Sequence, residues 1–254
     1  MWGLLSSTCL LVSTAQHRTA TKSLLGASSI NTIPQTTTIL VPFASYNLGK
    51  YGFCVIDNFL NPTTLRELGH DIETLRAAGR FRSARVGELS EKELNDQVRV
   101  AEQCFLHNNK QSDIPNAARD KTLERLDQLR KELSQISGTP LEPELDDLLY
   151  VYYPNGGFYK RHVDSTPGTP SVLRQFSILL YLNEQEWTNG MGGQLRLFAG
   201  DDDAVIDILP SGGRLVVFES NRIPHEVLLT NEKRIVLVGW FNRVPTDAEC
   251  KKFS

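Results

Sequence analysis

The chain has 254 residues, of which 40% are hydrophobic and 22% charged, and its formal net charge is −3. These values are typical of a globular protein with one large all-β domain or two small domains, and they disfavour a general nucleic-acid binder, which is usually basic. There is no run of roughly 18 apolar residues that would predict a membrane span, and the four cysteines lack the paired spacing of a zinc site or disulfide framework.

Residues 1–45 differ from the rest of the chain because they are rich in Ser and Thr and contain no acidic residue. Arg18 and Lys22 are their only basic side chains apart from a histidine. This composition is typical of a transit peptide for an organelle (mitochondrion or plastid), although the apolar run from Leu4 to Val12 also suits a secretory signal. A disordered leader without an address, in a cytoplasmic or nuclear protein, is the third alternative.

Residues 46–145 are expected to form a helical support with a substrate loop. After a short buried strand at residues 51–56, a helix is predicted from Asn61-Pro62 to Gly79, because Asn is a good N-cap, Pro fits the first turn and leucines recur at helical spacing. A second helix is predicted over residues 118–136, ended by Gly138. The polar segment between them, residues 80–117, is predicted to be a long loop or ribbon that could cover an active site.

After residue 145 the pattern changes from helical to strand-like, with Gly, Asn and Asp turn signals between short β-rich runs. The runs predicted as strands are 148–153, 176–182, 194–198, 204–208, 214–218, 226–229 and 234–241. Such a series indicates a sandwich or jelly roll, with the preceding helices packed on one outer face. The expected fold is therefore α+β, with a double-stranded β-helix (jelly roll) core over residues 146–243, N-terminal supporting helices and a tail over 244–254.

A His-x-Asp pair, His162 and Asp164, lies in this β-rich region, and His225 follows at the predicted start of a later strand. Positions i and i+2 of a strand point to the same face, so the pair is expected to enter one cavity from a single strand. Two imidazoles and one carboxylate suit the 2-His-1-carboxylate centre of non-haem Fe(II) oxygenases. The two other histidines outside the leader, His70 and His107, are not expected to be ligands.

Arg234 opens an apolar strand nine residues after His225. A buried guanidinium needs an anionic partner, and it binds a carboxylate through two parallel hydrogen bonds. The sequence therefore predicts an oxygenase that uses a dicarboxylate co-substrate.

These residues belong to a series of motifs that resembles the prolyl 4-hydroxylase group of Fe(II)/2-oxoglutarate dioxygenases, in particular the hypoxia-sensing prolyl hydroxylases and their microbial relatives. The resemblance extends over roughly residues 48–243 and is dense from 148 onward. The motifs are Tyr153-Pro-Asn-Gly-Gly-Phe-Tyr-Lys-Arg-His-Val-Asp164, Tyr181-Leu-Asn183, Gly192-Gly-Gln-Leu-Arg196, Pro224-His-Glu-Val227 and residues 234–240.

The resemblance implies that His162, Asp164 and His225 bind Fe(II), at a site that uses O2 and 2-oxoglutarate, with ascorbate as a candidate accessory. It also implies that Arg234 and Tyr181 bind the distal carboxylate of 2-oxoglutarate.

The same resemblance implies that Tyr153 lines the iron pocket and that three residues lie near the substrate: Trp240, Arg222 and Arg99. The family's usual Arg-Gly-Asp reads Arg99-Val-Ala101 here, and the Trp that often follows is replaced by Phe105 or a neighbour. These departures concern the substrate loop and leave the metal and co-substrate positions unchanged.

The implied activity is that of a peptidyl-proline (procollagen-proline type) 4-dioxygenase, which hydroxylates proline in a protein or peptide and releases succinate and CO2. Two alternatives remain open: the same chemistry on another residue or small molecule, and a non-catalytic metal-binding jelly-roll scaffold. A nucleic-acid demethylase is disfavoured, because that group carries a second Arg six residues after the first, where this chain has Trp240. The sequence predicts no nucleic-acid partner and does not specify the oligomeric state.

Overall fold

The computed structural model describes residues 38–40, 42–85, 94–106, 115–145, 148–184, 186–199 and 204–253. Its helices are α1 (Pro42–Tyr51), α2 (Pro62–Ala77), α3 (Ala117–Ser137) and α4 (Asp247–Phe253), with short 3-10 turns at Pro170–Leu173 and Asn189–Met191. Its strands are β1 (Phe53–Ile56), β2 (Arg82–Ser83), β3 (Arg99–Val100), β4 (Glu102–Phe105), β5 (Leu149–Tyr153), β6 (Phe158–His162), β7 (Arg174–Tyr181), β8 (Leu195–Ala199), β9 (Ala204–Ile208), β10 (Leu215–Glu219), β11 (His225–Val227) and β12 (Arg234–Asn242).

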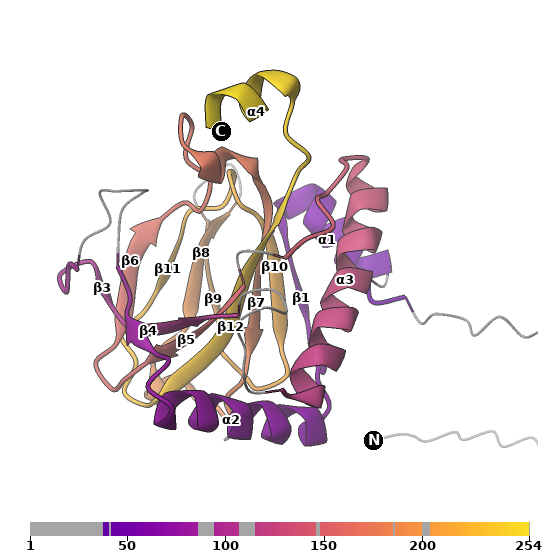
Figure 1. Cartoon of the computed structure of the whole chain (residues 1–254). Coiled ribbons are helices and arrows are strands. Elements are labelled where there is room, and N and C mark those ends of the chain that lie inside the picture. Colours follow the sequence, from indigo (N-terminus) through magenta and orange to yellow (C-terminus); the bar gives the residue numbers. More distant parts are fainter. Residues whose placement is uncertain are drawn as a thin grey trace, which may run out of the picture. The chain divides into compact units, whose positions relative to one another are not determined.

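Two antiparallel sheets form the body of the fold (Figure 1). The larger sheet has seven strands in the order β1-β10-β7-β12-β5-β4-β2, and the smaller has five in the order β3-β6-β11-β8-β9. The order mixes strands that are distant in the sequence, as in a jelly roll, and so confirms the predicted α+β class.

Each face of the large sheet packs against a different layer. Along β7, Ile178 and Leu180 belong to a core shared with the helices, whereas Leu179 and Tyr181 belong to a core shared with the small sheet. This alternation follows from the two-residue period of a strand. Helices α1, α2 and α3 therefore cover one outer face of the large sheet, as predicted for the N-terminal helices, and the space between the sheets is left for the functional site.

The two predicted helices form where their end signals indicate. The Asn61 side chain accepts a hydrogen bond from the Thr64 amide at 2.9 Å, and Gly138 ends α3 in the left-handed conformation at φ 67°. Ile136, near the end of α3, is 50% exposed and does not belong to the buried face of the helix. No helix in the described part of the chain is long and apolar enough to cross a membrane.

A buried polar network joins the helices to the large sheet. Arg119 on α3 donates through Nε to Asp71 Oδ2 on α2 at 2.9 Å, and Tyr150 on β5 donates its hydroxyl to the same oxygen at 2.9 Å. Asp71 is 1% exposed, so these two hydrogen-bond donors replace the water that would otherwise stabilise its carboxylate. Burial raises the pKa of Tyr150 well above its usual value, which keeps the hydroxyl protonated as a donor.

The segment predicted to be a long loop or ribbon, residues 80–117, contains three short strands within its described part. Strand β4 pairs with β5 at an edge region of the large sheet, and β3 pairs with β6 of the small sheet. Their side chains are mostly half-buried and polar, so they lack the apolar alternation that marks a strand. Helix α4 also lacks a strong sequence pattern and was not predicted, whereas β6 corresponds to the strand that was expected to carry His162.

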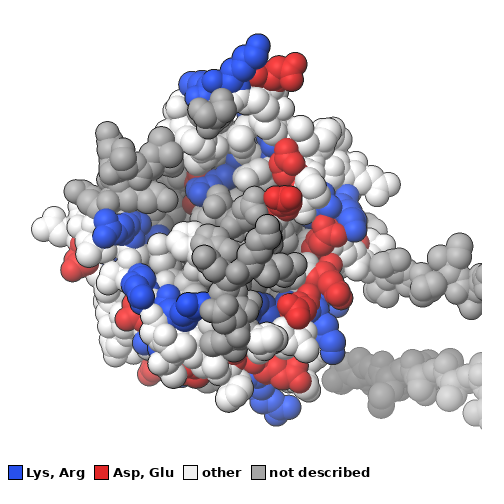
Figure 2. Space-filling model, in the orientation of Figure 1, with Lys and Arg blue, Asp and Glu red and all other residues white. Residues whose placement is uncertain are grey.

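Residues 1–37, most of the expected leader, lie outside the described residues, and their targeting role stays a prediction. The expected leader boundary at residue 45 falls inside α1. On the face shown in Figure 2, both acidic and basic side chains of the described residues are visible.

Candidate metal centre and co-substrate site

The three predicted metal ligands meet between the sheets. His162 and His225 are opposite each other on the paired strands β6 and β11, and their ring centres are 4.2 Å apart. Asp164 Oδ1 lies 3.6 Å from His162 Nε2, and Asp164 Oδ2 lies 3.7 Å from His225 Nε2. One ligand atom from each residue lies within 4.8 Å of the others, which suits a single ion with bonds of about 2 Å.

The expectation that one strand carries both His162 and Asp164 is wrong. Strand β6 ends at His162, and Asp164 lies in a bend two residues later. The strand also contains a bulge, because His225 pairs with His162 while Val227 pairs with Tyr159. The additional residue places Tyr159 on the face of His162, and the two rings stack with centres 3.7 Å apart.

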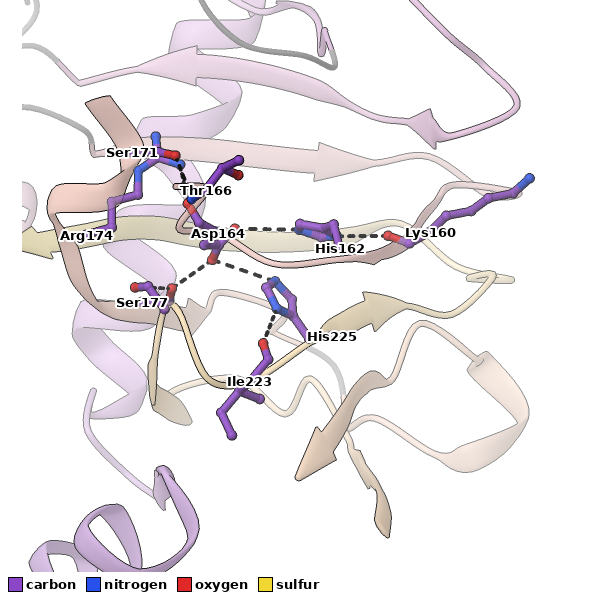
Figure 3. Close-up of polar contacts among 10 residues, drawn as sticks. Lys160, His162, Asp164, Thr166, Ser171, Arg174, Ser177, Ile223 and His225 are labelled. Carbon is purple, nitrogen blue, oxygen red and sulfur yellow. Dashed lines mark hydrogen bonds and ion pairs between the residues drawn. The ribbon is translucent and has the colours of Figure 1, made fainter. Parts of the chain in front are cut away.

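Backbone carbonyls orient the two imidazoles, as Figure 3 shows. His162 Nδ1 lies 2.8 Å from the Lys160 carbonyl, and His225 Nδ1 lies 3.1 Å from the Ile223 carbonyl. Because a carbonyl only accepts, Nδ1 carries the proton in both rings. The lone pair on each Nε2 is therefore free and directed toward Asp164, as a metal ligand requires.

The protonation states also suit a divalent cation. Burial, reinforced by the nearby His162, lowers the pKa of His225 to about 4, so its imidazole is neutral at pH 7. Burial alone would raise the pKa of Asp164, but the two histidines and a hydrogen bond from Ser177 hold it well below its usual range. A neutral His225 imidazole and an ionised Asp164 carboxylate match the donor set of non-haem iron sites.

Arg234 lies at the start of β12, fully buried, beside Tyr153 and Tyr181. Its Nε donates to the Gly193 carbonyl at 2.8 Å, whereas Nη1 and Nη2 have no hydrogen-bond partner among the described residues. The Tyr181 hydroxyl is likewise buried and without a partner there. Unpaired buried donors are costly, so this group of three fits an anionic ligand with several acceptor atoms, such as a carboxylate.

The ring of Tyr153 lies 4.9 Å from Arg234 Cζ, and the ring of Tyr181 lies 5.1 Å from the same atom. Burial raises the pKa of Tyr181 to about 12, although the charge of Arg234 acts in the opposite direction. The Tyr181 hydroxyl is therefore protonated at neutral pH and can donate. The residues present thus fit both a divalent metal and the carboxylate of a co-substrate.

A cavity of about 420 Å³ opens over the triad. Tyr153, Arg99 and Trp240 line it, but Arg222 does not. Arg222 instead contacts Glu219 Oε2 at 3.3 Å and donates to the Lys50 carbonyl at 3.3 Å. Its predicted role near the substrate has no support from this placement and stays a prediction, as do the substrate roles of Arg99 and Trp240.

Three residues around the cavity were not found from the sequence. Tyr159 stacks on His162, Arg174 Cζ lies 3.7 Å from the Trp240 ring, and Ser177 donates to Asp164 Oδ2 at 2.7 Å. Ser177 is a polar residue between Phe176 and Ile178 in β7, and this interruption of the apolar pattern could have identified it from the sequence. His70 is exposed on α2 away from the triad, and His107 lies outside the described residues.

Fold and site together define a jelly-roll protein with a 2-His-1-carboxylate centre and a buried carboxylate site beside it. A family model described as the 2OG-Fe(II) oxygenase superfamily matches residues 148–242. A prolyl-4-hydroxylase of Pseudomonas putida is 31% identical with a TM-score of 0.67, over 80% of this chain and 98% of its own length. The chain therefore belongs to the 2OG-Fe(II) oxygenase superfamily.

Two further similarities concern animal proteins. Egl nine homolog 1 of Mus musculus is 26% identical over 196 residues, which are 76% of this chain and 47% of the mouse protein. The chain thus spans about half the length of this relative. The prolyl hydroxylase of Trichoplax adhaerens, solved with a peptide fragment of the hypoxia inducible factor oxygen degradation domain, has a similar fold, with a TM-score of 0.68 at 24% identity over 78% of this chain and 87% of its own.

Proposed function

We propose that this protein is an Fe(II)- and 2-oxoglutarate-dependent dioxygenase that hydroxylates proline in a protein or peptide and releases succinate and CO2. One observation carries the proposal: a His-Asp-His group, in which Asp164 and His225 are buried, lies between the same two sheets as three buried donors that have no acceptor among the described residues. The similarity to a bacterial prolyl-4-hydroxylase, which this chain covers over 98% of its length, supports proline as the target.

His162, Asp164 and His225 would hold the metal on one side, and Arg234 with Tyr181 would bind the distal carboxylate of 2-oxoglutarate. When bound, Fe(II) supplies the activation of O2, so that one oxygen atom enters the substrate C–H bond and the other enters succinate as CO2 is lost. The protein itself orients the reactants and excludes water. Its fixed imidazole tautomers and its protonated Tyr181 hydroxyl meet these needs at neutral pH.

The opening of the cavity supports a peptide substrate. Trp240 and Tyr159 provide flat apolar walls, and the guanidinium of Arg99 lies 4.6 Å from the Tyr159 ring. Aromatic side chains suit the apolar ring of proline, while the polar side chains that also line the cavity suit a peptide backbone.

The test uses the full chain with Fe(II), 2-oxoglutarate, ascorbate and a synthetic library of proline-containing peptides. Mass spectrometry should detect succinate together with the mass of one added oxygen atom on a proline. His162→Ala should abolish both products. The control His70→Ala, which changes an exposed histidine on α2, should leave both unchanged.

Two other outcomes of this assay would each support a different function. Succinate without any hydroxylated proline would move the assignment to another residue or a small molecule. Metal binding without succinate, in the presence or absence of peptides, would instead favour a non-catalytic metal-binding scaffold.

A further inference from the structure

The position of Asp164 in a bend raises the question of what holds its carboxylate, because no strand fixes it. Two serines that are fully buried, Ser177 on β7 and Ser220 just after β10, lie directly behind it. Ser177 Oγ lies 2.7 Å from Asp164 Oδ2 (Figure 3) and 2.9 Å from Ser220 Oγ. The carboxylate is therefore held by two hydrogen bonds in series, made by serine hydroxyls that the large sheet carries.

The direction of this chain follows from the charge of Asp164. An ionised carboxylate can only accept, so the Ser177 hydroxyl proton points at Oδ2. That proton cannot also serve Ser220, so Ser220 donates to the Ser177 oxygen. The hydrogen bond from Ser220 polarises the Ser177 hydroxyl, and the hydrogen bond from Ser177 to Asp164 is therefore stronger than one from an isolated hydroxyl.

The backbone reinforces the same arrangement. The Ser165 amide donates to the Ser220 carbonyl at 3.2 Å, and Arg174 Nη1 donates to the Asp164 carbonyl at 3.1 Å. These two hydrogen bonds fix the backbone around Asp164, whereas the hydrogen bond from Ser177 fixes the rotation of the Asp164 carboxylate. Oδ2 accepts from the Ser177 hydroxyl and also lies 3.7 Å from His225 Nε2, whereas Oδ1 accepts nothing from Ser177 and lies 3.6 Å from His162 Nε2.

We propose that Ser177, oriented by Ser220, is a positioning residue that presents Asp164 Oδ1 to the metal and thereby sets metal affinity and site geometry. This inference rests on the proposed function, since it requires the triad to bind a metal. Hydrogen-bond partners of metal ligands typically contribute 10- to 100-fold in affinity, which is about the effect expected here.

The experiment titrates metal-free full-length protein with Co(II), whose visible absorption reports both affinity and coordination geometry. Ser177→Ala should weaken Co(II) binding by about 10- to 100-fold and change the spectrum. Ser177→Thr, which keeps the hydroxyl, should restore both. Ser220→Ala should show a smaller loss, and the double variant should be no weaker than Ser177→Ala, because the two serines act in series.

Ser171→Ala is the matched control. Ser171 is also buried near the same bend, but its hydroxyl accepts from the Thr166 amide at 3.0 Å and does not contact the carboxylate. The Co(II) affinity and the absorption spectrum of the Ser171→Ala variant should match those of the unaltered protein. An equal loss in Ser171→Ala would show that general order of the bend, rather than carboxylate orientation, matters, and would overturn the inference.

The possible failures are distinguishable. Unaltered protein that binds no Co(II) would contradict the proposed function itself. Unaltered protein that binds Co(II) with the same affinity and spectrum as Ser177→Ala would overturn only the role of Ser177. Thermal unfolding of the metal-free variants checks folding, and if Ser177→Ala is unfolded, the comparison of Ser220→Ala with Ser171→Ala decides the question.

Discussion

The guanidinium carbon of Arg234 lies 5.1 Å from the ring centre of Tyr181, and both side chains are fully buried. Within the described structure, their outer polar atoms have no hydrogen-bond partners. A protein does not normally leave three such donors unsatisfied in its interior. The pair is therefore best understood as one half of a binding site, whose other half arrives with the co-substrate.

Arg234→Lys should raise the concentration of 2-oxoglutarate needed for half-maximal turnover. Lysine keeps the charge but cannot form two parallel hydrogen bonds, and each lost charged hydrogen bond costs about 1.5–3 kcal/mol, or roughly 10- to 150-fold. Tyr181→Phe should give a smaller increase. The measurement is succinate release against 2-oxoglutarate concentration, and an unchanged requirement in Arg234→Lys would exclude this residue from the site.

Gly193→Ala should weaken the same site indirectly. Gly193 has φ +68°, and a Cβ there would lie 3.0 Å from Thr230 Cβ and 3.1 Å from Arg234 Cδ. We expect the displaced Arg234 to raise the 2-oxoglutarate requirement and the strained backbone to lower the free energy of unfolding by about 1–3 kcal/mol. Gly190→Ala is the control, because a Cβ there meets nothing within 4 Å; equal effects in both variants would contradict the explanation.

Much of the fold could be predicted because its core strands and helices carry strong local signals. The Asn61-Pro62 start of α2, the Gly138 end of α3 and the apolar run of β12 each specify an element within a few residues. The short strands β2, β3 and β4 could not be found, because they have few buried side chains and depend on partners distant in the sequence.

The metal triad could be predicted from residue types and order, but its local geometry could not. The bulge in β6 depends on pairing with β11, so neither the end of the strand at His162 nor the stacking of Tyr159 follows from local sequence. Ser177 lies 13 residues beyond Asp164 and contacts it only because β7 passes behind the bend. Such contacts are properties of the tertiary fold.

Asp71→Ala should strongly destabilise the protein. It would leave the guanidinium of Arg119, which is 5% exposed, without its buried carboxylate, and breaking a buried pair costs about 3–5 kcal/mol. Asp207→Ala removes a pair with Arg196 in which the two side chains are 39% and 33% exposed, and it should cost no more than about 1 kcal/mol. Chemical denaturation of both variants tests this difference, and equal losses would argue against the buried network as a major source of stability.

The attachment of α4 should weaken in acid. A hydrogen bond from Arg243, together with contacts from Thr246, lowers the pKa of Glu249 from 4.5 to about 2. Because the folded value is the lower one, the stabilising contribution is complete above pH 4.5 and is lost as the pH falls toward 2. The difference in unfolding midpoint between the unaltered protein and Glu249→Gln should therefore shrink across this window. A constant difference would contradict the assignment.

The two halves of the site belong to different sheets. His162 and His225 are carried by the small sheet, whereas Arg234, Tyr181 and Tyr153 are carried by the large one. The spacing between the metal-ligand side chains and the carboxylate-binding side chains is consequently set by the thickness of the apolar core between the sheets. Substitutions in that apolar core can therefore change the distance between the two halves of the site without altering any residue that lines it.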